Sequence, residues 1–171
     1  MQIKFKTSIM HLEDLPLDVG YASERVHVKD TNNTVHSLGG QNGKTQLILT
    51  TPVIDEMFTQ ELKKIEEILP KGGEYEVTAS IIVANNYHKN PGLEGFDFLI
   101  DSDEEFGDYY GVRLRGEPYN NEFAKALILI SKDGAIFYDE FVDDIDKEFN
   151  SDTLMRKIYA AQTCYTGKGC H

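Results

Sequence analysis

The fold of this chain is decided by one stretch, Leu47-Ile48-Leu49-Thr50-Thr51-Pro52-Val53-Ile54-Asp55-Glu56-Met57-Phe58-Thr59, and by the pattern that follows it to residue 69. An apolar run comes first and predicts a buried strand. A proline then interrupts the run, and a helical pattern begins. This strand–loop–helix order is typical of α/β folds, which often carry reactive groups in such a loop.

The helical pattern has one apolar face. Phe58, Leu62, Ile65 and Leu69 recur at helical spacing, and Asp55 can cap the free N–H groups at the start of the helix. The charged residues between them are expected to face mostly outward; they are Glu61, Lys63, Lys64, Glu66 and Glu67. Pro70 and the glycines that follow it end the helix.

Further strands and helices are expected on both sides of this unit. We expect strands at residues 3–9, 26–28, 77–84, 96–100, 126–130 and 135–142, and helices at 103–110 and 152–163, the last capped by Ser151. This order predicts an α/β protein with a central mixed sheet flanked by helices and an N-terminal β extension. Residues 1–163 are expected to form a single domain, followed by a cysteine-containing tail at 164–171.

Composition restricts the function classes. In 171 residues, 17 Lys and Arg oppose 29 Asp and Glu, giving a formal net charge of −12. Such a charge opposes binding to nucleic acid and to anionic membranes. The sequence contains no membrane-spanning apolar stretch and no secretory signal pattern, so we expect a cytoplasmic protein.

Several short motifs resemble one family, the bacterial thiol peroxidases, which are atypical two-cysteine peroxiredoxins with a thioredoxin-like fold. Residues 52–55 resemble the family's Pro-Ser-Ile-Asp. The other matching positions are Phe106 with Tyr110-Gly111-Val112, Pro118, Ala124-Lys125-Ala126 with the strand after it, Ile136-Phe137, and Val142-Asp143-Asp144-Ile145. Their order and spacing cover most of the chain, from about residue 26 to residue 158.

The functional positions of that family differ here. The resemblance implies that Pro52 matches the proline of the Pro-x-x-x-Thr-x-x-Cys motif, while Glu56 replaces its threonine and Thr59 its peroxidatic cysteine. Lys125 stands where the family has an arginine. The resolving cysteine expected after residues 77–84 is absent, and segment 85–95 is shortened.

These replacements predict a loss of peroxidase chemistry. Peroxide reduction needs a low-pKa thiolate, which a threonine hydroxyl without a base cannot replace. Glu56 adds negative charge to the pocket, Lys125 lacks the planar donor fork of arginine, and the two side chains could pair with each other. We therefore expect a thiol-peroxidase-like protein, without cofactor, that acts by binding a protein partner and that forms a homodimer, as the resemblance implies.

The tail leaves three interpretations open. Cys164 and Cys170 enclose a glycine-containing segment that can close a disulfide, and Lys168 and His171 could lower a thiol pKa. The tail could thus serve a thiol–disulfide oxidoreductase, or half of a metal site in an accessory protein, or have no specific role. The spacing is wrong for a structural zinc pair, so no metal ligands are assigned. The scattered histidines are expected to be solvated, and the acidic run near residue 143 lacks the pattern of a calcium loop.

Overall fold

A computed structural model describes residues 1–163, which form two sheets and three helices. The strands are β1 (Gln2–Phe5), β2 (Ser8–Leu12), β3 (Val26–Lys29), β4 (Val35–Leu38), β5 (Thr45–Thr50), β6 (Val77–Val83), β7 (Asp97–Ile100), β8 (Leu114–Arg115), β9 (Ala126–Ile130) and β10 (Ile136–Phe141). The helices are α1 (Glu56–Ile68), α2 (Glu105–Tyr110) and α3 (Ser151–Thr163). None of the helices in this part of the chain has the length and apolar character needed to cross a membrane.

The main sheet is mixed, as predicted. Its seven strands lie in the order β10-β9-β5-β6-β7-β3-β4. The central strands β5, β6 and β7 are parallel, while β9 and β10 continue the sheet in antiparallel pairs on one side. On the other side, β3 pairs antiparallel with β7 and β4. The fold is thioredoxin-like, of the peroxiredoxin type.

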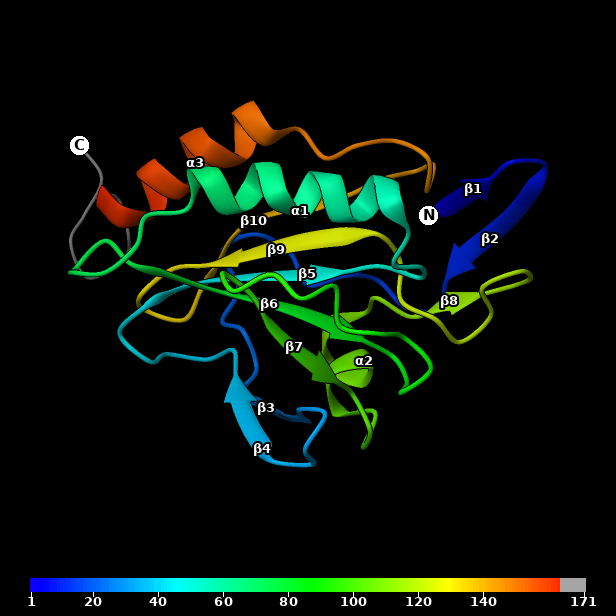
Figure 1. The fold of residues 1–171 in the computed structure, drawn as a ribbon, viewed down its shortest axis with the longest axis horizontal. Coiled ribbons are helices and arrows are strands. Elements are labelled where there is room, and N and C mark those ends of the chain that lie inside the picture. The colour runs from blue at the N-terminus through cyan, green and yellow to red at the C-terminus, as the bar shows by residue number, and fades with distance from the viewer. Residues whose placement is uncertain (164–171) are drawn as a thin grey trace.

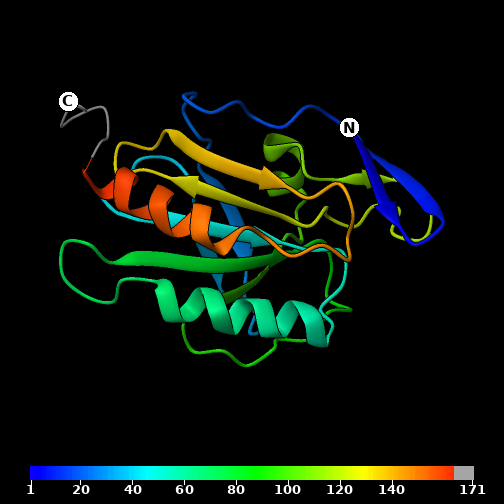
Figure 2. The ribbon, with the colours of Figure 1, turned by 90° about the horizontal axis from the view of Figure 1, so that it is seen from above.

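Helices cover both faces of this sheet (Figures 1 and 2). α1 and α3 lie over one face, and α2 lies under the other. The alternation of side chains along β5 divides the core accordingly: Leu47 and Leu49 pack with α1 and α3, whereas Ile48 packs with Phe106 and Tyr110 of α2. All six residues of β5 are buried, as expected for a central strand.

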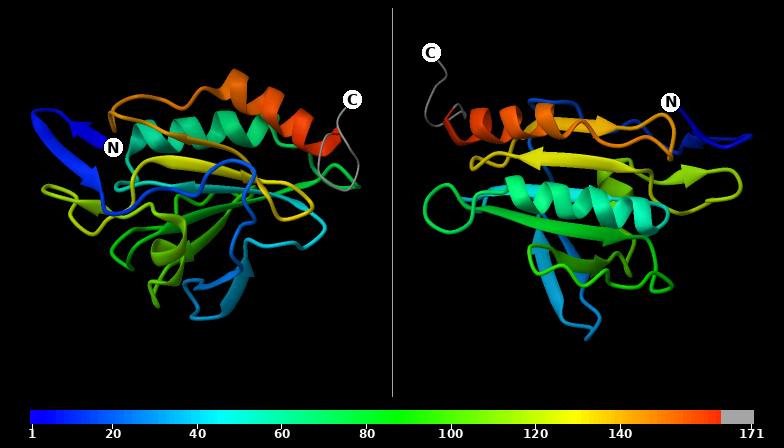
Figure 3. Two further views of the ribbon diagram at one scale, coloured as in Figure 1. Left: turned by 180° about the vertical axis from the view of Figure 1, so that it is seen from behind. Right: turned by 45° about the horizontal axis from the view of Figure 1, so that its top comes forward.

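The N-terminal extension differs from the prediction of one strand over residues 3–9. It is a hairpin of β1 and β2 that turns at Lys6, whose φ of 54° is left-handed, and it pairs with β8. The turn changes which side chains face inward, so Met10 is buried while Ile9 is exposed. The hairpin lies at the end of the sheet where α1 begins (Figure 3).

The helix assignments are largely confirmed. Asp55 caps α1 by accepting the backbone N–H of Phe58 at 2.8 Å, and Phe58, Leu62 and Ile65 are buried. The prediction that Glu61 faces outward is wrong, because only 4% of this residue is exposed. At the start of α3 the capping side chain is Asn150 rather than Ser151, and it accepts the backbone N–H of Thr153 at 3.0 Å.

Candidate functional site

The candidate site lies where β5 ends and α1 begins, at the carboxyl end of the parallel strands. Pro52 is buried in the connecting loop, and the Thr51 hydroxyl donates to the carbonyl oxygen of Val53 at 2.7 Å. Val53 in turn packs against a small core that contains Ile3 and Met10 of the hairpin. The N-terminal extension therefore supports the loop that leads into the site.

Thr59 lies in the first part of α1 and is partly buried. Its hydroxyl donates to the carbonyl oxygen of Asp55 at 2.9 Å, and the same carbonyl accepts the backbone N–H of Thr59 at 3.0 Å. Threonine commonly bonds back to its own helix in this way. In residues 1–163, no histidine or carboxylate side chain is hydrogen-bonded to this hydroxyl, so nothing there activates it as a nucleophile.

Glu56 does not pair with Lys125, contrary to the expectation from the sequence. Glu56 is exposed, and its Oε1 accepts the side-chain N–H of Gln60 at 2.7 Å. As the first residue of α1 it projects into solvent, outside the apolar stripe that faces the sheet. The structure therefore separates Glu56 from Lys125, which pairs with a different carboxylate of the same helix.

Lys125 is buried and bonded to Glu61. Lys125 is 1% exposed, and its Nζ lies 2.5 Å from Glu61 Oε2. The ammonium also donates to the carbonyl oxygen of Lys147 at 2.6 Å, and the rings of Phe58 and Phe149 lie 6.0 and 5.2 Å from Nζ. The other carboxylate oxygen of Glu61 accepts the backbone N–H of Phe149 at 2.8 Å.

The polar groups of Glu61 and Lys125 are hydrogen-bonded within the protein. Both oxygens of Glu61 accept hydrogen bonds, and two of the three ammonium protons of Lys125 are donated while the rings cover the charge. Burial raises the pKa of nearby Glu140, a shift that the Asn150 backbone N–H opposes and the Glu61 charge reinforces. The Lys125 ammonium is therefore bonded to groups of the protein itself.

Sequence reasoning missed Glu61 although two patterns mark it. Glu61 lies three residues after Phe58 and four before Ile65, which places it within the apolar stripe of α1. Lys125 stands between Ala124 and Ala126 at the start of an apolar strand. A carboxylate and an ammonium that both fall on buried faces must be paired, because burying either charge alone is costly.

A second polar cluster joins segment 85–95 to Glu122. Nε2 of His88 lies 2.8 Å from Glu122 Oε2, and the Asn85 side-chain N–H donates to Glu122 Oε1 at 2.7 Å. The expectation of a solvated histidine is wrong for His88, whose side chain is only 14% exposed. Burial favours a higher pKa for Glu122, but the bonds from His88 and Asn85 outweigh it and lower the pKa below its ordinary value.

The cysteine pair and the metal alternative depend on the tail. Cys164 and Cys170 lie outside the described residues, and so does the 164–171 segment expected to form the tail. Within residues 1–163, no group of three or more histidine, cysteine or carboxylate side chains is arranged to hold a metal ion.

Comparisons with known proteins find relatives that are thiol peroxidases. No protein-family model matches the chain. A thiol peroxidase of Campylobacter jejuni is 26% identical over 177 aligned residues, which cover 99% of this chain and 98% of the relative. A thiol peroxidase of Aquifex aeolicus is 27% identical over 71% of this chain and 75% of the relative. These two relatives support a resemblance of this chain to the thiol peroxidases.

Solved structures support the same fold. A peroxiredoxin-like protein from Aquifex aeolicus has a TM-score of 0.80 and 22% identity, covering 94% of this chain and 96% of its own. A thiol peroxidase from Chromobacterium violaceum has a TM-score of 0.77 and 15% identity, covering 94% of this chain and 97% of its own. The peroxiredoxin-like fold thus extends over nearly the whole chain, and its candidate site holds Thr59 and the buried Lys125.

Proposed function

We propose that this chain is a thiol-peroxidase-like protein that has lost peroxidase chemistry and acts by binding or interaction. The observation that carries the proposal is the sealed site: the Thr59 hydroxyl is bonded to its own helix, and Lys125 is bonded to Glu61 and to the Lys147 carbonyl. The proposal includes a cytoplasmic location and a homodimer, both expected from the sequence and its resemblance.

Peroxide reduction requires two things that this site does not supply. A sulfur nucleophile must attack one peroxide oxygen, and a donor group must stabilise the negative charge that develops on the departing oxygen. Threonine at position 59 cannot perform the first step. The ammonium of Lys125 cannot reach a peroxide without first leaving a buried carboxylate, which would then lack its counter-ion.

A peroxidase assay with the whole chain tests the proposal. Hydrogen peroxide and an alkyl hydroperoxide are supplied with thioredoxin as reductant, and we expect no turnover above the rate without protein. The matched control is the Cys164→Ser/Cys170→Ser double variant, which lacks every cysteine of the chain. Turnover that persists in this double variant would overturn the proposal, because only methionine sulfur remains.

The same assay tests a thiol–disulfide oxidoreductase that uses Cys164 and Cys170. Turnover present in the native chain and absent from the double variant would assign activity to the cysteine pair. Lys168 and His171, which flank the second cysteine in the sequence, would favour the thiolate in that case. Titration of thiols before and after mild oxidation then shows whether the pair forms a reversible disulfide.

A further inference from the structure

The amino-terminal part of β6 has a neighbouring strand on one side only. β5 pairs with β6 along its whole first half, where Thr45 lies opposite Val77 and Leu47 opposite Ala79. On the other side β7 begins only at Asp97, opposite Ser80. Within residues 1–163, no strand pairs with Val77–Ala79 on that side.

Backbone groups of β6 point toward this open edge. The carbonyl oxygen of Val83 accepts the N–H of Asp101 at 2.9 Å, so Val83 directs its backbone groups toward the β7 side. Because these directions alternate along a strand, Val77 and Ala79 face the same side. In this parallel register the Ala79 carbonyl lies against the Asp97 N–H of β7, so the groups left at the open edge are the Ala79 N–H and the Val77 carbonyl. The preceding loop covers only the start of the edge, where the N–H of Val77 donates to the Pro70 carbonyl at 3.3 Å.

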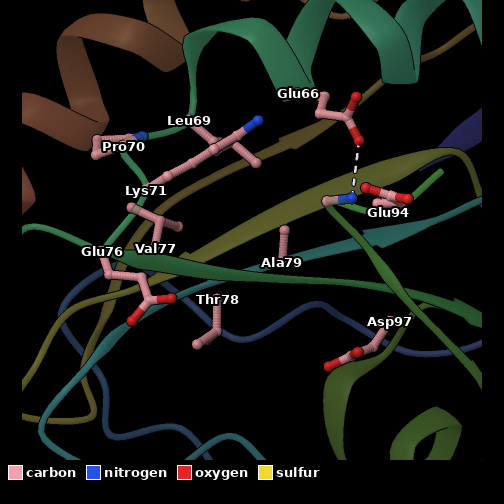
Figure 4. A pocket seen from close by; sticks show the side chains of 11 residues that line it. Glu66, Leu69, Pro70, Lys71, Glu76, Val77, Thr78, Ala79, Glu94 and Asp97 are labelled. Carbon is pink, nitrogen blue, oxygen red and sulfur yellow. Dashed lines mark hydrogen bonds between the residues drawn. The ribbon is translucent and has the colours of Figure 1, made fainter. Parts of the chain in front are cut away.

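A hollow of about 430 Å³ lies over this edge (Figure 4). Its floor is β6, its roof is the end of α1, and its far wall is the segment that leads into β7. Glu66 links α1 to that wall, because its Oε2 accepts the backbone N–H of Gly95 at 2.8 Å. The small side chain of Ala79 leaves space beneath Glu66.

The lining of this hollow is acidic. Its carboxylates are Glu66, Glu76, Glu94 and Asp97, and among residues 1–163 the only lysine or arginine that lines it is Lys71. Glu76 also lies 3.8 Å from the Nζ of Lys44, outside the hollow. Glu94 and Asp97 are exposed. A second hollow of about 280 Å³ shares Thr78 and Asp97 with the first, and its lining also includes Lys44 and His36.

We propose that this acidic groove along the open edge of β6 binds an extended peptide that carries lysine or arginine side chains. The peptide backbone pairs with the Ala79 N–H and the Val77 carbonyl and continues the line of β7, which is the usual way in which an exposed sheet edge binds a peptide. Because side chains of a strand alternate, one basic side chain reaches Glu66 and Glu94 and the next lies toward Asp97.

Charge argues for a basic peptide over a second copy of this chain. The chain carries a formal net charge of −12, and two such grooves placed edge to edge would bring their carboxylates together. The inference rests on the proposed binding role and gives it a partner class. Peptide binding depends on β6 and the end of α1, whereas the loss of peroxidase chemistry depends on Thr59 and Lys125. An experiment can therefore contradict one of these two proposals and leave the other standing.

The test uses the full chain and a fluorescein-labelled peptide, Val-Arg-Arg-Val-Arg-Arg, in which neighbouring arginines point to opposite faces of a strand. Binding is measured by fluorescence anisotropy at moderate salt. The comparison peptide replaces each arginine by glutamate. The test variant is Glu94→Gln/Asp97→Asn, and the matched control is Glu67→Gln/Asp152→Asn, which removes the same charge from exposed positions outside the groove. Backbone amide NMR of the native chain locates the bound peptide.

We expect the basic peptide to bind and the acidic peptide not to bind. The groove variant should weaken binding about three- to tenfold, as the loss of two exposed ion pairs implies, while the control variant should leave it nearly unchanged. The Ala79 and Asp97 amide signals should shift, and the Ala79 amide should exchange more slowly with solvent.

Three outcomes would overturn the inference. One is no binding of the arginine peptide at about 1 mM. Another is equal weakening by the groove and control variants, which would show attraction to net charge alone. The last is a shift of the Ala79 amide with protein concentration in the absence of peptide, because a second copy would then occupy the edge.

Discussion

Glu61 and Glu66 lie on the same helix, five residues apart, and have opposite surroundings. Glu61 is 4% exposed, and its two carboxylate oxygens accept hydrogen bonds from Lys125 and from the Phe149 backbone. Glu66 is only partly buried, binds one backbone N–H, and borders a hollow with other carboxylates. One end of α1 closes a site with a buried counter-ion, and the other leaves acidic groups available to an external cation.

The comparison shows how the protein separates structural charge from available charge. A charge removed from water must be compensated within the fold, so Glu61 and Lys125 bind each other and the loop that passes over them. A carboxylate in contact with water needs no such partner and can pair with a ligand at little cost. We therefore expect an incoming cation to bind near Glu66, where carboxylates contact water, and not near Glu61, which is already paired.

The largest expected effect comes from breaking the buried pair. Lys125→Met leaves the Glu61 carboxylate buried without a counter-ion, and we expect a loss of about 3–5 kcal/mol in the free energy of unfolding. Urea denaturation measures this loss. The double variant Glu61→Leu/Lys125→Met should recover most of it, because both charges are then absent.

The double variant also decides whether the pair acts as a unit. Strong non-additivity between the two single variants and the double variant is expected for groups in one network. If the losses in the free energy of unfolding were additive, Glu61 and Lys125 would not stabilise each other, and Glu61 would be as independent of a counter-ion as Glu66.

Leu62 tests which face of α1 is turned toward the sheet. It follows Glu61 directly and is 0% exposed, so Leu62→Ala should lower the free energy of unfolding by about 2–5 kcal/mol. The matched control is Lys63→Ala at the adjacent exposed position, which should change it by less than about 0.5 kcal/mol. Similar losses for both variants would mean that α1 is rotated, and the contrast between Glu61 and Glu66 would disappear.

The sequence predicted the elements better than the partners of side chains. The apolar run of β5, the Asp55 cap and the Phe58–Leu62–Ile65 stripe are local patterns, and all three are confirmed. The register of the N-terminal hairpin was missed because it depends on the turn at Lys6, whose backbone conformation is not encoded by apolar spacing.

For the candidate site, the sequence places Pro52 and Thr59 together, but the pairing of Lys125 with Glu56 that it suggests is wrong. Pro52 and Thr59 lie in one loop–helix unit, as expected, and Lys125 faces the same helix. Which carboxylate meets Lys125 depends on how α1 lies across β9, a long-range relation over 64 positions. The motif suggests Glu56 as the partner of Lys125, whereas the buried face of α1 presents Glu61 to it.

Glu66 should contribute much less to stability than Glu61. Glu66→Ala removes one hydrogen bond to the Gly95 N–H from a partly solvated position, so we expect a loss of about 1 kcal/mol in the free energy of unfolding. The same variant should increase hydrogen exchange at the Gly95 amide. A loss as large as that of Lys125→Met would mean that the groove wall, like the closed site, is part of the core.

The smallest expected effect concerns Glu122, a third carboxylate, which lies between the two extremes. Its folded-state pKa is lower than the ordinary value of 4.5, because the bonds from His88 and Asn85 outweigh its burial. A lowered pKa gives stability that is present above the unfolded-state pKa and is lost as pH falls through the folded-state pKa. The native chain should therefore exceed Glu122→Gln in free energy of unfolding at neutral pH, by less than about 1 kcal/mol because the group is partly solvated.

That difference should shrink as pH falls below about 4.5 and through the lower folded-state pKa of Glu122, where the native carboxylate becomes protonated as well. Asp101 and Glu140 have pKa values raised chiefly by burial, so they favour the folded state on acidification. Their effect is common to both proteins and cancels in the difference. Urea denaturation at a series of pH values measures it. A difference that stayed constant, or grew on acidification, would show that His88 and Asn85 do not stabilise the charged form of Glu122, and the cluster would then resemble neither the sealed pair nor the open groove.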